Sequence, residues 1–133
     1  MWSPLPTDIN APALSSLAHA VWTGREMIVM SGIAGAFSVV AYEPGTRSWK
    51  PLAARPSTAG GKFGDPVWTG NRIIWHQGGH NDIYDINAGT WSKGSLPSLF
   101  WTSHAAVWTG TQFIGWGGRF ENGELLPLGF KYE

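Results

Sequence analysis

Apolar and polar residues along this chain form a pattern of short runs that occurs three times. Each copy begins with the word Val-Trp-Thr-Gly, at residues 21–24, 67–70 and 107–110, and continues into an apolar run. The word returns after 46 and then 40 residues. Because a Trp-containing word of four residues rarely recurs by chance in 133 residues, the pattern indicates tandem structural repeats.

The repeat predicts four strands in each unit. We expect the first strand to end at the Trp of the word, and Thr-Gly to form a tight hairpin in which Gly supplies a positive φ. The second strand is the apolar run, whose near-continuous hydrophobicity predicts burial on both faces. The third carries a Tyr followed by an acid, and the fourth begins at a Trp. These landmarks are Tyr42-Glu43, Tyr84-Asp85 and Tyr132-Glu133 for the third strand, and Trp49 and Trp91 for the fourth.

This order of landmarks resembles the kelch repeat, and in particular bacterial kelch-like proteins. The apolar strands of the second and third units lead into a double glycine, at 78–79 and 117–118. The first unit has Ser31-Gly32 at that place, which indicates a divergent member. The resemblance covers essentially the whole chain, and it implies an all-β propeller of four-stranded blades around a central channel.

The repeat also predicts how the chain is organised and assembled. We expect one domain, residues 1–133, made of three blade units at about 2–48, 49–90 and 91–133. Trp2-Ser3-Pro4-Leu5 matches Trp49-Lys50-Pro51-Leu52, so the chain is predicted to open on a fourth, outermost strand and to close on a third.

Propellers have about four to eight blades, so three are too few to close a ring. Two copies would give a six-bladed homodimer in which the Trp2 strand of each copy completes the last blade of its partner. A nine-bladed trimer, a propeller shared with another chain and an excised fragment are the alternatives.

Composition narrows the classes of partner. Nine Lys and Arg balance nine Asp and Glu, which argues against nucleic acid or an anionic membrane as partner. The chain has no Cys, which excludes thiolate metal sites, a Cys nucleophile and the Cys-Tyr cofactor of galactose oxidase-like enzymes. No apolar run approaches the roughly 20 residues of a membrane span, and no signal peptide is visible. We therefore expect a soluble cytoplasmic protein without cofactor or metal.

The candidate ligand-binding residues follow from where propeller loops meet. The connections from second to third strand, and from fourth strand to the next first strand, lie together at one mouth of the channel. On this basis the candidates are His80, Asn81, Asp82, Trp101, His104, Arg119 and Glu121.

Each candidate has a functional and a structural interpretation. The run 80–82 is predicted to lie in a loop, where it serves as an acid-base or sugar-contacting group or is a solvated turn. Arg119 and Glu121 either bind an anionic group or form a local ion pair. Trp101 is placed to stack on a sugar or a peptide. His104 enters an inner strand, where it faces the channel or ties blades together.

These residues favour a noncatalytic binding or interaction module for a small polar ligand, a glycan or a peptide, with no catalytic residue assigned. The alternative is an enzyme similar to kelch-fold sugar epimerases or mutarotases acting on sialic-acid-like substrates. For that alternative, His80, His104, Arg119 and Glu121 are the groups to test. A lectin-like glycan binder and a purely structural fragment are the remaining interpretations.

Overall fold

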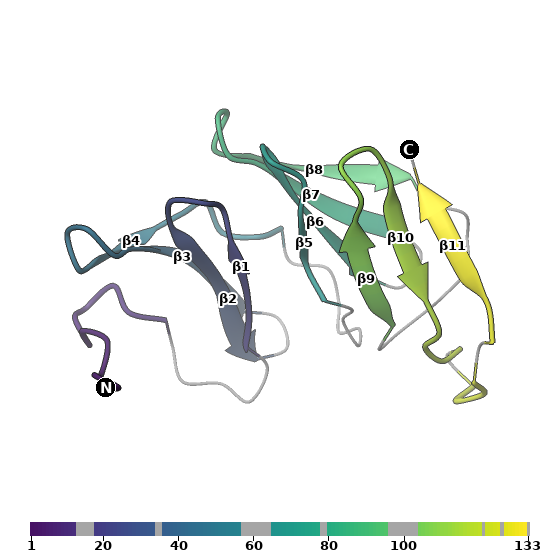
Figure 1. Ribbon diagram of the computed structural model, residues 1–133, viewed down its shortest axis with the longest axis horizontal. Helices are drawn as coiled ribbons and strands as arrows, with labels where there is room; N and C mark the ends of the chain where they lie inside the picture. Colours follow the sequence, from purple (N-terminus) through teal and green to yellow (C-terminus); the bar gives the residue numbers. More distant parts are fainter. Residues whose placement is uncertain are drawn as a thin grey trace. The chain divides into compact units, whose positions relative to one another are not determined.

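The computed structural model describes residues 1–12, 18–33, 36–56, 65–77, 80–95, 104–120, 122–125 and 127–132. Within these ranges the chain is all-β and forms three antiparallel sheets (Figure 1). None of the described residues forms a helix that is long and apolar enough to cross a membrane.

The three sheets repeat one topology. The first contains β1 (Ala18–Trp22), β2 (Met27–Ile33), β3 (Ala36–Glu43) and β4 (Ser48–Pro51), and the second contains β5 (Val67–Trp68), β6 (Arg72–Gln77), β7 (His80–Asp85) and β8 (Thr90–Ser95). The third contains β9 (Ala105–Trp108), β10 (Phe113–Trp116) and β11 (Gly129–Tyr132). In each sheet, strands adjacent in sequence are hydrogen-bonded neighbours. The predicted order of strands within each sheet is therefore confirmed, including a last sheet of three strands.

The chain divides into two compact units. Met1–Ser57 holds the first sheet, and Thr58–Glu133 holds the second and third. The first unit has a core of Val29, Val40, Tyr42 and Trp49, and the second has a core of Val67, Ile74 and Phe113. Residues of the third sheet pack against this second core, so the second and third sheets stack face to face within their unit.

The Val-Trp-Thr-Gly word closes the hairpin between the first and second strands. In the first copy, the Thr23 N–H donates to the carbonyl of Glu26 at 3.0 Å, and the Thr23 hydroxyl accepts from the Glu26 N–H at 3.0 Å. The other two copies have the same pair of hydrogen bonds. Gly24, Gly70 and Gly110 have φ of 94°, 102° and 104°, as predicted for this turn. The word is repeated because both Thr and Gly are needed there.

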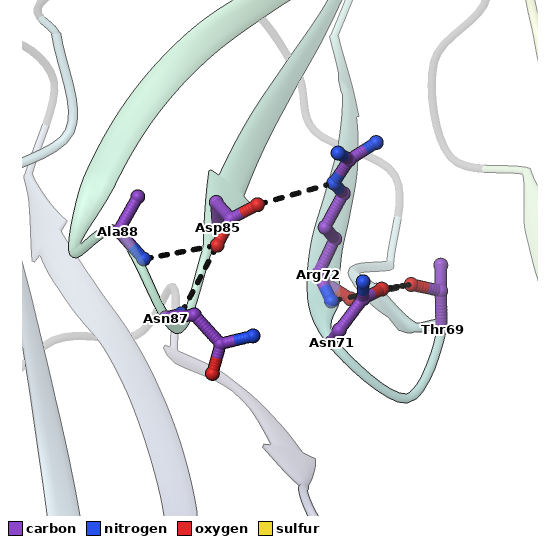
Figure 2. Close-up of polar contacts among 6 residues, drawn as sticks. All are labelled: Thr69, Asn71, Arg72, Asp85, Asn87 and Ala88. Carbon is purple, nitrogen blue, oxygen red and sulfur yellow. Dashed lines mark hydrogen bonds and ion pairs between the residues drawn. The ribbon is translucent and has the colours of Figure 1, made fainter.

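The acid after the Tyr of the second sheet has a structural role that Figure 2 shows. One carboxylate oxygen of Asp85 accepts the N–H groups of Asn87 and Ala88, both at 3.0 Å, and the other accepts from Arg72 Nε at 3.3 Å. The hydrogen bond from Ala88 is the main cause that lowers the pKa of Asp85. Asp85 therefore shapes the β7–β8 turn and joins it to β6.

A Tyr–Trp pair joins the third and fourth strands in both four-stranded sheets. Tyr42 lies opposite Trp49 with ring centroids 4.9 Å apart, and Tyr84 lies opposite Trp91 at 5.0 Å. The interplanar angles, 48° and 43°, are also close. This contact explains why the sequence repeats a Tyr and then a Trp.

One expectation about strands concerns pairing with a second copy of the chain, and another is wrong. Residues 1–12 are described and contain no strand. Instead, this segment packs on the first sheet, where the Trp49 indole donates to the Pro6 carbonyl at 2.7 Å and Ala11 contacts the core. Burial of the second strand on both faces holds for β2 and β6 but fails for β10, because Ile114 and Trp116 are exposed.

Candidate functional site

The run 80–82 lies in strand β7 and not in the predicted loop. Only residues 78–79 separate β6 from β7. Strand β7 begins at His80 and pairs along its whole length with β6 and β8. Asn81 and Asp82 are 0% and 1% exposed. The interpretation of a solvated turn is therefore wrong for these two residues.

Strand geometry separates Asn81 from Asp82. Successive side chains of a strand point to opposite faces, so the two neighbours cannot serve one site on one face. In the register, Asn81 lies opposite His76 and Asp82 lies opposite Trp75. Asp82 therefore shares its face with the buried indole of Trp75, while Asn81 shares its face with His76.

Asn81 belongs to a buried polar cluster between the second and third sheets. His76 Nδ1 lies 3.1 Å from Asn81 Oδ1, so with this oxygen as acceptor the proton of His76 is on Nδ1. The rings of His76 and His104 are 4.7 Å apart at 67°. Phe130 packs against both rings, at 5.6 Å and 5.5 Å. His76 and His104 are 2% and 3% exposed.

Burial sets the charge of this cluster. It is the largest cause of the lowered pKa of His104, which is about 4; the nearby His76 also lowers this pKa, and Asp65 raises it. His104 is therefore neutral near pH 7. Neither of its ring nitrogens has a hydrogen-bond partner among the described residues. The neutral imidazole packs between the two sheets and does not face solvent.

His76 was missed by the sequence analysis. Its sequence signal is its position two residues after Ile74, on the same face of an apolar strand. That alternation places His76 inward, yet it does not reveal that His104, from a distant segment, meets it. The contact arises only when the second and third sheets stack.

The remaining candidates are distributed differently. Trp101 and Glu121 lie outside the described residues. Arg119 is exposed, and its Nη1 donates to the Gly123 carbonyl at 3.0 Å. The structure thus brings Asn81 and His104 into one buried cluster and places Arg119 on the surface.

Arg119 belongs to a structured connection between β10 and β11. The Phe120 N–H donates to the Glu124 carbonyl at 3.0 Å, and the Gly123 N–H donates to the Phe120 carbonyl at 2.9 Å. At the base of the connection, the Gly117 N–H donates to the Leu128 carbonyl at 3.0 Å. We call residues 117–128 the β10–β11 connection.

Among the described residues, no group of three or more His, Asp or Glu side chains is placed to hold a metal ion. In comparisons with known proteins, neither a protein-family model nor a curated protein matches this chain.

Proposed function

We propose that this chain is a noncatalytic binding or interaction module, built from kelch-type propeller blades, whose ligand surface is the β10–β11 connection. One observation carries the proposal. The equivalent connections in the other two sheets consist of residues 34–35 and 78–79, whereas this one spans residues 117–128. An extended loop on a rigid sheet scaffold is typical of a binding surface.

The side chains of the β10–β11 connection suit a polar ligand. Arg119, Asn122, Glu124 and Leu125 are all exposed. Backbone hydrogen bonds inside the connection hold its backbone in place before a ligand binds, which reduces the conformational entropy lost on binding. Hydrogen-bond donors and acceptors beside exposed apolar side chains, Leu125 and Leu128, match the chemistry of a glycan or a peptide.

Glycan and peptide arrays probed with the labelled full chain test this proposal. We expect binding to one of the two classes, weakened at least about tenfold by Arg119→Ala, since a hydrogen bond from a charged group contributes about 1.5–3 kcal/mol. The matched control is Arg25→Ala, another exposed Arg, in the hairpin between β1 and β2. No binding on either array, or equal loss in both variants, would contradict the proposal.

The same proposal includes a closed ring. The second and third sheets stack through Val67, Ile74 and Phe113, which supports this part of the proposal. Two copies would supply six blades, and a closed two-fold ring would leave no blade face unstacked. Light scattering is expected to give a mass near twice 14.4 kDa. A monodisperse folded monomer would contradict the ring.

The Tyr–Trp pairs support exchange of the first residues between copies. Tyr132 is the counterpart of Tyr42 and Tyr84, and β11 has β10 as its only hydrogen-bonded neighbour among the described strands. Trp2 is fully exposed. We propose that Trp2 of one copy lies opposite Tyr132 of the other, in the arrangement of Trp49 and Tyr42.

Cysteine cross-linking tests this exchange, since the chain has no Cys of its own. With Trp2 opposite Tyr132, the register of the other sheets places Ser3 opposite Lys131. Oxidation of a mixture of Ser3→Cys and Lys131→Cys chains is expected to link two chains, while each variant alone does not link. A disulfide inside one chain of the double variant would show that no exchange occurs.

A further inference from the structure

The three sheets differ in the burial of equivalent positions. Aligning the Val-Trp-Thr-Gly words matches Val107, Ile114 and Trp116 of the third sheet with Val67, Ile74 and His76 of the second and with Val21, Ile28 and Met30 of the first. The positions in the first two sheets are at most 9% exposed. Their counterparts in the third sheet are 58%, 38% and 65% exposed. We call Val107, Ile114 and Trp116 the open face.

The open face is a continuous apolar surface. Val107 and Ile114 are register partners on β9 and β10, and Trp116 follows two residues later on the same side of β10. A Cβ atom on Gly129 would lie 2.6 Å from the Trp116 ring, so the absence of a side chain there lets the indole lie across β11. Exposed apolar surfaces of this kind mark sites of protein association.

A second exposed surface lies on β1 of the first sheet, and the equivalent residues of the third sheet are packed. Ala18, Ala20 and Trp22 lie on one side of β1, and all three are exposed. We call them the β1 face. Their counterparts in the third sheet are His104, Ala106 and Trp108. His104 is buried, and Ala106 and Trp108 pack on the core of the second unit.

The contact between the second and third sheets is a template for joining these two surfaces. There, the cluster that contains Val67 and Ile74 has Ala106 and Trp108 packed against it, and His76 contacts His104. Val107 and Ile114 of the open face are counterparts of the first pair, and Ala20 and Trp22 of the β1 face are counterparts of the second. The open face and the β1 face are thus the two surfaces needed for a second contact like the one between the second and third sheets.

We propose that the open face binds the β1 face of a second copy of the chain. This inference rests on the proposed ring and names the surfaces that close it. A two-fold ring contains this contact twice, with each copy giving its open face to the β1 face of the other. Each of the two contacts then repeats the stacking of the second and third sheets.

The template places Trp116 against Ala18. In the template contact His76 meets His104, whose counterparts are Trp116 and Ala18. Within the chain, two imidazole rings of equal size meet. Between two copies, the large indole of Trp116 would meet the small side chain of Ala18. Close-packed contacts require such complementary volumes. The Trp116–Ala18 pair is therefore the specific feature that tests this contact.

Exchanging the two side chains gives the test, measured by light scattering and sedimentation on full-length chains. Trp116→Ala leaves Ala opposite Ala, and Ala18→Trp places Trp opposite Trp, so each variant alone is expected to dimerise poorly. Truncation of a central Trp weakens a contact about 30-fold, and two contacts give a loss of roughly 10³-fold. Mixing the two variants restores Trp opposite Ala in both contacts, so the mixture is expected to regain the wild-type mass.

The outcomes separate this inference from the proposed ring. Leu125→Ala, which removes an exposed apolar side chain outside the open face, is the matched control and is expected to keep the wild-type mass. A monomeric wild type would overturn both the ring and this contact. A dimeric wild type whose mass is unaffected by either variant, or is not restored by mixing folded variants, would overturn the contact alone. Circular dichroism spectra establish that each variant is folded.

Discussion

Acid is expected to destabilise the second unit through His104. The folded-state pKa of this residue is about 4, below the usual 6.5, because its ring is buried between two sheets beside His76. Above pH 6.5 the ring is neutral in both states, so stability does not depend on it. Below pH 6.5 the unfolded chain binds a proton that the folded chain excludes, and stability falls.

The size of the effect follows from the two pKa values. Each pH unit between 6.5 and about 4 lowers the free energy of unfolding by up to about 1.4 kcal/mol, because one proton is bound only in the unfolded state. At pH 5 the loss is about 2 kcal/mol, and below pH 4 it levels off near 3 kcal/mol. Asp65 limits the loss, since its carboxylate favours the protonated ring.

Urea unfolding at fixed protein concentration between pH 7.5 and pH 4.5 measures this dependence. His104→Gln removes the titrating group, so the difference in unfolding free energy between pH 7.5 and pH 5 is expected to shrink by about 2 kcal/mol. His19→Gln, which removes a His of the first unit, is the matched control for the substitution. NMR titration of the His104 ring gives its pKa directly, and a value near 6.5 would refute the argument.

Two further predictions concern local packing. Gly115→Ala is expected to lower the free energy of unfolding by about 1–3 kcal/mol, because its Cβ would lie 2.4 Å from the Phe130 ring, which neighbouring rings hold in place. Gly45→Ala, in an exposed turn, is the control for urea unfolding, and an equal loss in both variants would contradict the steric argument. Asp85→Ala is expected to lower the melting temperature more than Arg72→Ala, since only the first removes the turn hydrogen bonds as well as the ion pair. Equal melting temperatures would show that the turn bonds do not contribute.

The sequence alone determined the order of the strands within each sheet. Val-Trp-Thr-Gly identifies each first hairpin because the conformation of that turn depends on residues within the word itself. The Tyr and Trp landmarks locate the third and fourth strands for a similar reason, since their rings meet across directly paired strands. Interactions of this kind depend only on residues that are close together in the sequence, so a short stretch of sequence is enough to predict them.

Only the tertiary structure decided which of these positions are buried and what they contact. Asn81 and Asp82 are adjacent in the sequence, yet the pairing of β7 sends them to opposite faces. His76 and His104 form a pair only because two sheets stack. Val67 and Val107 occupy the same place in identical words, but one is 6% and the other 58% exposed. Burial depends on the neighbouring sheet, and no repeat encodes within itself whether a neighbour follows.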